Sequence, residues 1–385
     1  MRVLAVSHAY PRFDGDLAGA FLERLYEALT ARGHTVRVIV PADQGQGGEV
    51  RRRGIVVERV RYATARRETL AYRGTMIQAL RSPAGLLAFR GLVRALARAV
   101  GARADDADVV HANWWVPGGY AVWCARRVGM PPCVLTLHGT DAALLQRSWG
   151  ARLIARPVLQ NARAVTTVSS FLAAIAERAG ARPTPVVLPM PVDGGSVPTS
   201  LAGGGGVVTV GRLTRQKRLQ LVIEAVAELH ARGRGMHLTV VGDGPERSAL
   251  EGTAVRLGLR EHVRFTGAVP PEAVPGLLAG ADVFAFPARH EGFGLAVAEA
   301  LMAGVPVVVA ADGGGVLDIA RECPGAEIVP VADAGAWAAA IGRLNGNAAA
   351  RSKAAVAGAE WRERLRPAAV AERFEAVLES VCRRT

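Results

Sequence analysis

The sequence predicts an α/β protein with two domains, each built on a parallel sheet covered by helices. Apolar runs of strand length alternate with helical patterns along all 385 residues, which is typical of parallel sheets with helices on both faces. A segment rich in proline and glycine interrupts this alternation near the middle of the chain. Half of the residues are hydrophobic, which is enough to bury two cores.

The first half contains seven apolar runs that we expect to form strands. Helical patterns separate several of them, so the strands should run parallel in one sheet. The expected strands lie near 2–7, 35–40, 55–60, 108–112, 132–137, 163–168 and 185–188. The expected helices include Ala18–Arg32, Gly85–Val100 and Phe171–Ala179.

The second half repeats the alternation with six strands. They are expected near 206–211, 236–241, 262–265, 282–286, 306–309 and 326–329. The helices between and after them include Leu219–Arg232, Glu246–Leu257, Gly294–Ala303 and Ala334–Leu344.

Proline, glycine and small polar residues dominate the segment from Leu188 to Gly206. This composition is typical of a linker, and the alternation starts again after it. We therefore expect a first domain at 1–190, a linker at 191–205 and a second domain at 206–366, with a terminal helix near 367–385 packing back on the first domain.

The net charge of +13 is concentrated in the first half of the chain. Residues 1–200 hold 26 arginines, no lysine and 14 acidic residues, a balance of +12, whereas the remainder holds 21 basic and 20 acidic residues, a balance of +1. Such asymmetry indicates an anionic partner, for which nucleic acid, a membrane and a phosphorylated molecule are the candidates. Nucleic acid is not expected, because no binding motif is present and aromatic residues are not interleaved with the arginines.

The cysteines and the N-terminus indicate a cytoplasmic protein. The four cysteines are widely spaced and show no metal-binding or disulfide pattern. No signal-peptide pattern follows Met1, and no run of roughly 18–20 apolar residues could span a bilayer. The inner face of the membrane is the second candidate location.

Two common nucleotide-binding motifs are absent. Neither half has a dinucleotide-binding GxGxxG after its first strand, and the chain has no GxxxxGK[ST] phosphate loop, which argues against dehydrogenases and P-loop NTPases.

The strongest motif is the run from Arg289 to Pro306, which reads RHEGFGLAVAEALMAGVP. It follows an apolar strand, and its glycine-rich turn leads into a helix. Free N–H groups and the positive helix end therefore lie at the carboxyl edge of the sheet, where a phosphate can bind. Glu291 on the turn could accept bonds from sugar hydroxyls, and Glu299, about two turns along the helix, suits ribose hydroxyls. A capped surface helix with an incidental pair of glutamates is the alternative.

A second motif, VGRLTRQKR, runs from Val210 to Arg218 after the first strand of the second half. Arg212 and Lys217 lie on one short loop, where two cations would neutralise a diphosphate. A solvated basic loop is the alternative.

The GRL…K loop followed by EGFGLxxxE resembles the retaining GT-B glycosyltransferases of family 4, and the likeness covers nearly the whole chain. It implies the GT-B architecture, with two facing Rossmann-like domains. It also implies that Arg212 and Lys217 bind a diphosphate, that Glu291 orients the donor hexose and that Glu299 binds ribose. The main chain of Gly292, Phe293, Gly294 and Leu295 would line the phosphate, and the segment ending at Val269 would contact the base.

The run Thr136–Asp141, reading TLHGTD, follows a strand of the first half. By the same resemblance His138 contacts the donor sugar and is the first catalytic candidate, while Asp141 orients it or binds the acceptor. A structural histidine is the alternative. Family members often have adjacent glycines in the first loop, close to the phosphates and the acceptor. Here Gly15 and Gly19 are separated, and we expect Gly19, at the helix start, to be the one that approaches the donor. Asp318 stands where the family more often has glutamate, and we assign it no role.

The resemblance implies transfer of a hexose-type sugar from a UDP- or GDP-sugar with retention of configuration. We favour front-face substitution, in which the departing phosphate accepts the acceptor proton. No essential metal and no cofactor are expected. The acceptor is expected among cell-envelope glycans, glycolipids or secondary metabolites, with lipid-linked molecules as candidates. A sugar-nucleotide epimerase, a non-catalytic sugar-nucleotide sensor and an anionic-polymer-binding protein are the alternatives.

Three features of the first half could meet the acceptor or an anionic membrane. Arg90, Arg94 and Arg98 recur every four residues and form a basic stripe beside Leu86, Phe89, Val93, Leu96 and Val100. An ordinary amphipathic helix with these apolar residues in the core is the favoured interpretation. Arg51–Arg53 adds to the basic surface or forms a solvated turn. Trp114 and Trp115 line the acceptor side or pack in the core.

Overall fold

The computed structural model describes residues 1–72, 76–192, 204–330 and 333–383. Most of the expected linker, at 193–203, lies outside the described residues. The chain forms two compact units: unit 1 comprises Met1–Val192 and Arg366–Thr385, and unit 2 comprises Asp193–Leu365. No helix in the described ranges is both long enough and apolar enough to cross a bilayer.

Unit 1 is built on an eight-stranded sheet with the order β3-β4-β2-β1-β5-β6-β7-β8. Neighbouring strands are parallel apart from β3 and β4. In the register of β1 and β2, Leu4 lies opposite Arg37. The strands are β1 (Arg2–Val6), β2 (Thr35–Pro41), β3 (Gly48–Arg52), β4 (Ile55–Val60), β5 (Val109–Asn113), β6 (Cys133–Leu137), β7 (Ala164–Thr167) and β8 (Val186–Val187).

The antiparallel edge strand β3 is a feature that the sequence analysis missed, so the expectation of a purely parallel sheet was wrong at this edge. β3 and β4 form a hairpin whose two turn residues, Arg53 and Gly54, both have positive φ, 50° and 81°, as tight two-residue hairpin turns require. β3 is exposed apart from half-buried Arg52, so no apolar run marks it in the sequence.

Helices pack on both faces of this sheet. They are α1 (Ala20–Ala31), α2 (Met76–Ala79), α3 (Pro83–Arg103), α4 (Tyr120–Ala125), α5 (Thr140–Arg147), α6 (Trp149–Asn161), α7 (Ser170–Arg178) and α15 (Pro367–Cys382). A π-helical turn, η3 (Trp114–Gly119), joins β5 to α4. The start of α3 is capped by Ser82, whose hydroxyl accepts from the Gly85 N–H.

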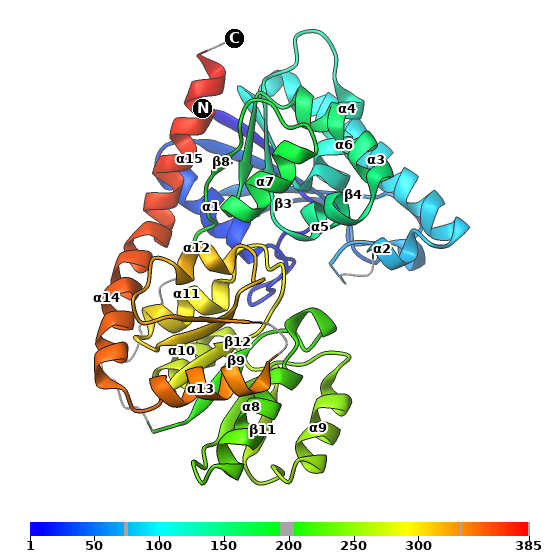
Figure 1. The fold of residues 1–385 in the computed structure, drawn as a ribbon. Coiled ribbons are helices and arrows are strands. Elements are labelled where there is room, and N and C mark those ends of the chain that lie inside the picture. Colours follow the sequence, from blue (N-terminus) through cyan, green and yellow to red (C-terminus); the bar gives the residue numbers. More distant parts are fainter. Residues whose placement is uncertain (73–75, 193–203, 331–332, 384–385) are drawn as a thin grey trace. The chain divides into compact units, whose positions relative to one another are not determined.

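The terminal helix α15 belongs to unit 1 although it follows unit 2 in the sequence. It packs beside α1 (Figure 1). Phe374 is fully buried, with its ring 4.6 Å from the ring of His111. Glu375 accepts hydrogen bonds from Arg32 and lies 2.8 Å from His34 Nε2. The helix is therefore attached to unit 1 by apolar packing and by ion pairs.

Unit 2 has a six-stranded parallel sheet with the order β11-β10-β9-β12-β13-β14. Its strands are β9 (Val207–Val210), β10 (Leu238–Val241), β11 (Val263–Gly267), β12 (Val283–Phe286), β13 (Val307–Ala310) and β14 (Glu327–Val329). Its helices are α8 (Gln220–Ala231), α9 (Arg247–Arg256), α10 (Val274–Ala279), α11 (Leu295–Met302), α12 (Val316–Ala320), α13 (Ala334–Leu344) and α14 (Ala348–Leu365). One continuous core, which includes Val226, Val283 and Trp337, joins α8 and α13 to the sheet.

The strand order of unit 2 reverses between β9 and β12, which are adjacent but are separated by two strands in the sequence. Ligands of open α/β sheets bind at the carboxyl edge beside such a switch point. The loops that follow β9 and β12 carry the two motifs that the sequence analysis singled out. This topology therefore places Arg212, Lys217 and Glu291 near one edge.

Candidate functional site

The turn that leads from β12 into α11 is fixed by backbone contacts with the loop before α12. Glu291 N–H donates to Gly313 O and Gly315 N–H donates to Glu291 O, each at 2.8 Å. Gly294 caps α11 with φ 92°, and a Cβ there would lie 2.4 Å from Val316 Cγ2. Gly294 is therefore required by conformation and by space.

Lys217 and Glu291, from the two motifs, are in direct contact. Lys217 Nζ donates to Glu291 Oε2 at 2.7 Å, and both side chains are only about one-fifth exposed, 17% and 22%. The ammonium also lies 4.5 Å from the centre of the Phe286 ring, a cation–π arrangement that stabilises its position. The structure thus brings together two residues that the sequence analysis assigned to phosphate and sugar.

The neighbouring Arg218 holds the Lys217 loop in place. Its guanidinium makes two hydrogen bonds with Asp312, at 2.6 and 3.0 Å, and donates to Pro287 O at 2.8 Å. Arg218 also has a positive φ of 48°. The sequence analysis assigned no role to Arg218, which ties the loop after β9 to the segments after β12 and β13.

The other expected donor-site residues of unit 2 lie on the same loops and helix. Arg212 follows β9 with an exposed side chain that forms no ion pair within the described part of the chain. Glu299 is half-buried on α11. Val269 is half-buried just after β11. The remaining expected residues form the turn and the start of α11: Gly292, Phe293, Gly294 and Leu295.

This edge of unit 2 can bind a polyanion that carries hydroxyl groups. Lys217 and Arg212 supply cations, the first N–H groups of α11 supply donors, and Glu291 supplies an acceptor for hydroxyls. Because Lys217 is already oriented by Glu291 and Phe286, an incoming phosphate would meet a cation whose position is set before binding.

In unit 1, His138 follows β6 and contacts Asn113 at the end of β5. Asn113 Nδ2 donates to Tyr26 Oη at 2.8 Å and to Val6 O at 3.4 Å, so its Oδ1 faces His138. His138 Nε2 lies 2.9 Å from that oxygen and must carry the proton. Nδ1 then presents a lone pair. Burial lowers the pKa of His138 well below its usual value, and His111 and His8 lower it further, so the ring is neutral.

Trp114 lies between two histidines. The centre of its ring is 4.3 Å from that of His8 and 4.3 Å from that of His138. Its backbone has φ 59°, a conformation that is unfavourable for a bulky residue and that is often found at functional sites. Phe21 of α1 packs on both His138 and Trp114, with ring centres 5.1 and 6.1 Å away.

Asp141 is buried in the loop that carries His138. Its carboxylate accepts from the backbone N–H groups of Trp115, His138 and Gly139, at 3.0–3.2 Å. Burial raises its pKa, and the backbone hydrogen bonds counter that rise. Asp141 thus holds the main chain at His138, and its expected role in the site stays a prediction.

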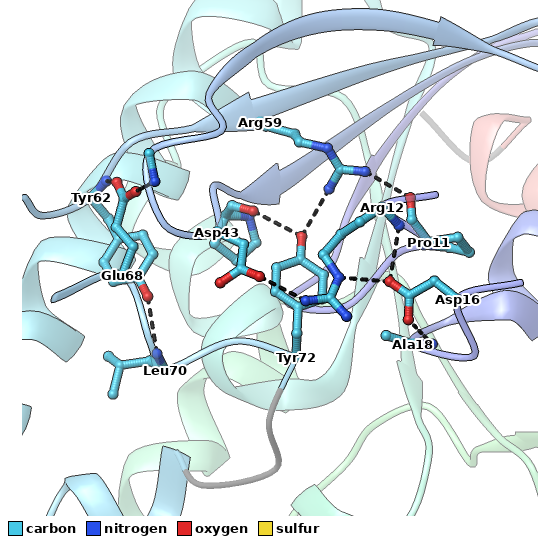
Figure 2. A network of polar contacts seen from close by, with 12 residues as sticks. Pro11, Arg12, Asp16, Ala18, Asp43, Arg59, Tyr62, Glu68, Leu70 and Tyr72 are labelled. Atoms are coloured by element: carbon cyan, nitrogen blue, oxygen red, sulfur yellow. Dashed lines mark hydrogen bonds and ion pairs between the residues drawn. The ribbon is translucent and has the colours of Figure 1, made fainter. Parts of the chain in front are cut away.

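The first loop, which follows β1, is held by an ion-pair network (Figure 2). Arg12 donates to Asp16 at 2.6 Å and to Asp43 at 2.7 Å, and its guanidinium lies 4.8 Å from the Tyr72 ring. Asp16 also accepts from the N–H groups of Arg12 and Ala18. This network fixes the entry to α1.

Gly19 begins α1 with φ 76°, and a Cβ there would lie 2.5 Å from Ala9 O. Gly15 also has positive φ, 86°, but its surroundings are open. Gly19 is thus the glycine that the fold itself requires. Its contact with a ligand stays a prediction.

Two arginines of the expected basic surface in unit 1 form ion pairs. Arg52 forms ion pairs with Glu23 and Asp14, and Arg53 pairs with Glu27 at 3.1 Å. Arg51 and Arg52 lie in β3, and only Arg53 lies in the hairpin turn, so the expected solvated turn at Arg51–Arg53 was wrong for the first two. The stripe on α3 is different, because its members are exposed and form no ion pair within the described ranges: Arg90, Arg94 and Arg98.

The apolar side of α3 agrees only in part with the favoured interpretation. Val93, Leu96 and Val100 are buried, as an amphipathic helix requires. Leu86 is 50% exposed, so its expected place in the core was wrong. The neighbouring Leu87 is also exposed.

Two family models match the chain and together span most of it. The model "Glycosyl transferases group 1" matches residues 204–361, and "Glycosyl transferase 4-like domain" matches residues 18–191. The D-inositol 3-phosphate glycosyltransferase of Corynebacterium jeikeium is 29% identical, over 89% of this chain and 88% of its own length. The 2-deoxystreptamine glucosyltransferase of Streptomyces kanamyceticus is 31% identical over 49% of this chain, and the match spans only about half of that relative, 55%.

Solved structures share the fold over the whole chain. Sucrose-phosphate synthase from Thermosynechococcus elongatus has a TM-score of 0.78 at 22% identity, and the match covers 100% of both chains. Anabaena HepE in complex with UDP-glucose has a TM-score of 0.71 at 21% identity, over 99% of this chain and 100% of HepE. The fold is thus the GT-B type, with two parallel-sheet α/β domains. The chain belongs to the group 1 glycosyltransferases, the family 4 type that its motifs resemble.

The sequence analysis missed His8 and Asn113 as members of the site in unit 1. Each stands at or just after the carboxyl end of a strand, β1 for His8 and β5 for Asn113. That position in a parallel sheet is a usable signal for a site residue. Neither residue belongs to a recognisable motif, so only contacts with Trp114 and His138 reveal them.

Proposed function

We propose that this protein transfers a hexose-type sugar from a UDP- or GDP-sugar to an acceptor hydroxyl with retention of configuration. The observation that carries this proposal is the contact between Lys217 and Glu291 at the turn into α11. A cation for the diphosphate and a carboxylate for the sugar hydroxyls lie side by side there. Known relatives support the donor class: HepE is described in complex with UDP-glucose, and a mannosyltransferase of Mycolicibacterium smegmatis, 36% identical over 40% of this chain, is described as GDP-mannose-dependent.

In the proposed mechanism the donor diphosphate leaves as the acceptor hydroxyl attacks on the same face of the sugar. Lys217, Arg212 and the N-terminus of α11 stabilise the charge that develops on the phosphate. The departing phosphate takes the acceptor proton. Glu291 orients the hexose, Glu299 binds ribose, and neutral His138 accepts a bond from the donor sugar.

We further propose that the reaction needs no divalent metal, because the protein's own cations can stabilise the diphosphate. Product formation should therefore continue at an unchanged rate in excess EDTA. Restoration of a lost rate by Mg²⁺ or Mn²⁺ would contradict this part of the proposal.

The acceptor is proposed to belong to cell-envelope glycans, glycolipids or secondary metabolites, and the enzyme to work in the cytoplasm, with contact to the anionic inner face of the membrane. The unpaired arginines on α3 support the contact.

The donor is tested by thermal-shift measurements with UDP-, GDP- and ADP-sugars, followed by product analysis with a radiolabelled form of the donor that stabilises the protein most. We expect nucleoside diphosphate and a glycosylated acceptor whose anomeric configuration, read by NMR, equals that of the donor. An epimerised donor without glycosylated product, or an inverted anomer, would contradict the proposal.

A further inference from the structure

A cavity of about 580 Å³ lies within unit 1, in the size range of pockets for small organic ligands. Residues of α2, α3, η3, α4, α5 and α6, labelled in Figure 1 except for η3, line it. His8 and Trp114 also line it, and Trp114 packs against His138. The cavity is therefore continuous with the side chains of the unit 1 site.

The walls of this cavity are mainly aromatic and aliphatic. Trp114 and Trp115 line it although they are only 7% and 2% exposed, so each presents a small part of its ring. Phe89 and Tyr120 add further aromatic rings, and Leu144 lies among the aliphatic residues. Such walls favour a flat apolar ligand, which gains by burial and by ring stacking.

Several polar groups of the lining already have partners. Both oxygens of the Asp141 carboxylate accept backbone N–H groups, those of Trp115, His138 and Gly139. Ser148 Oγ accepts from the Ala151 N–H at the start of α6. Asp141 and Ser148 therefore offer a ligand few free acceptor sites, and each polar ligand atom that is buried here without a partner is costly.

Among the side chains of the lining, His8 has the fully buried polar atom that forms no hydrogen bond with a described residue. Neither of its ring nitrogens forms a hydrogen bond with a described residue. Nδ1 is fully covered by protein atoms, whereas the side chain as a whole is partly exposed, so Nε2 is the nitrogen that a ligand can reach. Burial lowers the pKa of His8 to about 4, and a neutral imidazole can accept or donate one hydrogen bond.

We propose that this cavity is the acceptor site and that the acceptor is a small aromatic molecule carrying a hydroxyl group, which His8 binds through Nε2. This inference rests on the proposed glycosyl transfer and specifies its acceptor. The aromatic body fills the apolar cavity, and one hydroxyl satisfies the one unpaired imidazole.

Binding of 2-naphthol, measured by isothermal titration calorimetry, tests the cavity. Gly150 lines it, and a Cβ there would have only Ser148 Oγ within 4 Å, at 3.8 Å. Gly150→Leu should therefore fill part of the cavity without a backbone clash and weaken 2-naphthol binding about tenfold or more. Gly101→Leu is the matched control, because Gly101 is also a helical glycine of unit 1 with open space around it, and it is not part of the lining. This control should change the affinity less than about twofold.

The role of His8 is tested by comparing 2-naphthol with 2-methoxynaphthalene. The wild type should bind the hydroxyl form about three- to tenfold more tightly, as one hydrogen bond allows. His8→Phe keeps a ring against Trp114 but removes the nitrogens, so the ratio of the two affinities should fall to about one. An unchanged ratio in His8→Phe would overturn the assignment of His8.

Binding of UDP and GDP, measured in the same preparations, separates this inference from the proposed function. Nucleotide binding without 2-naphthol binding would overturn the aromatic acceptor and leave the donor site standing. 2-Naphthol binding equal in Gly150→Leu and wild type would also overturn it. So would tight binding of 2-deoxystreptamine that Gly150→Leu weakens, because the cavity would then accept a polar molecule. If the folded wild type bound neither a nucleotide nor 2-naphthol, the proposed function and this inference would both be overturned.

Discussion

Lys217 and Glu291 are 74 residues apart in the sequence, yet the ammonium of one lies 2.7 Å from the carboxylate of the other. Each belongs to a different motif, one after β9 and one after β12, and these strands are neighbours in the sheet of unit 2. The contact joins two motifs that are far apart in the sequence. It also means that each side chain holds the other in position before any donor binds.

Replacing Lys217 by alanine should reduce kcat about 100-fold or more, because a cation that stabilises the leaving diphosphate is lost. Glu291→Ala should also reduce turnover strongly, through loss of sugar orientation and of the Lys217 position. The chain has one other lysine, Lys353, which is exposed on α14, so Lys353→Ala is the matched control. Circular dichroism should show intact folds in all three variants. A wild-type rate in Lys217→Ala or in Glu291→Ala would remove that residue from the site.

Replacing Gly294 by alanine should destabilise unit 2 by about 2–4 kcal/mol. A left-handed conformation costs an L-residue about 1–2 kcal/mol, and the clash with Val316 adds a cost of similar size. Gly258 also has positive φ, 74°, but its Cβ position is open, so Gly258→Ala should show the conformational cost alone. Urea denaturation of both variants measures the difference. Equal losses would show that the clash is relieved by movement of Val316.

Stability should fall as the pH falls below about 6.5, partly because of His111. This side chain is fully buried, Tyr26 Oη lies 2.9 Å from its Nδ1 and Thr136 Oγ1 lies 2.8 Å from its Nε2. Burial lowers its pKa to about 3. Between pH 6.5 and 3 the unfolded chain therefore binds a proton that the folded chain does not, so acid favours unfolding.

One such histidine contributes at most about 1.4 kcal/mol per pH unit to the slope of the free energy of unfolding against pH in this range. His111→Gln should reduce the pH dependence of the free energy of unfolding, measured by urea denaturation from pH 7 to 5, whatever its effect on stability at pH 7. An unchanged slope would show that other groups dominate.

Removing the basic stripe of α3 should weaken binding to anionic vesicles. Each arginine near a charged membrane surface contributes about 1 kcal/mol, so the triple change of Arg90, Arg94 and Arg98 to glutamine should reduce binding on the order of 100-fold. The control changes three ion-paired arginines of unit 1 to glutamine: Arg2, Arg37 and Arg127. Cosedimentation with phosphatidylserine vesicles at low salt measures both. Equal effects would indicate attraction by net charge without a defined surface.

Much of the fold and of the candidate site in unit 2 could be predicted because their signals are local. Every strand expected from an apolar run is present. β3 was missed because it is mostly exposed and has no such run. The motif around Glu291 could be recognised because a glycine turn and the helix it begins are continuous in the sequence.

The sequence by itself determined the alternation of strands and helices, the two motifs of unit 2 and the family to which the chain belongs. Only the tertiary structure decided that Arg218 anchors the Lys217 loop, and that His8, Trp114 and His138 pack together beside an apolar cavity. Hydrophobic periodicity depends on near neighbours along the chain. Packing depends on which distant segments meet, and these three rings come from the loops after three different strands.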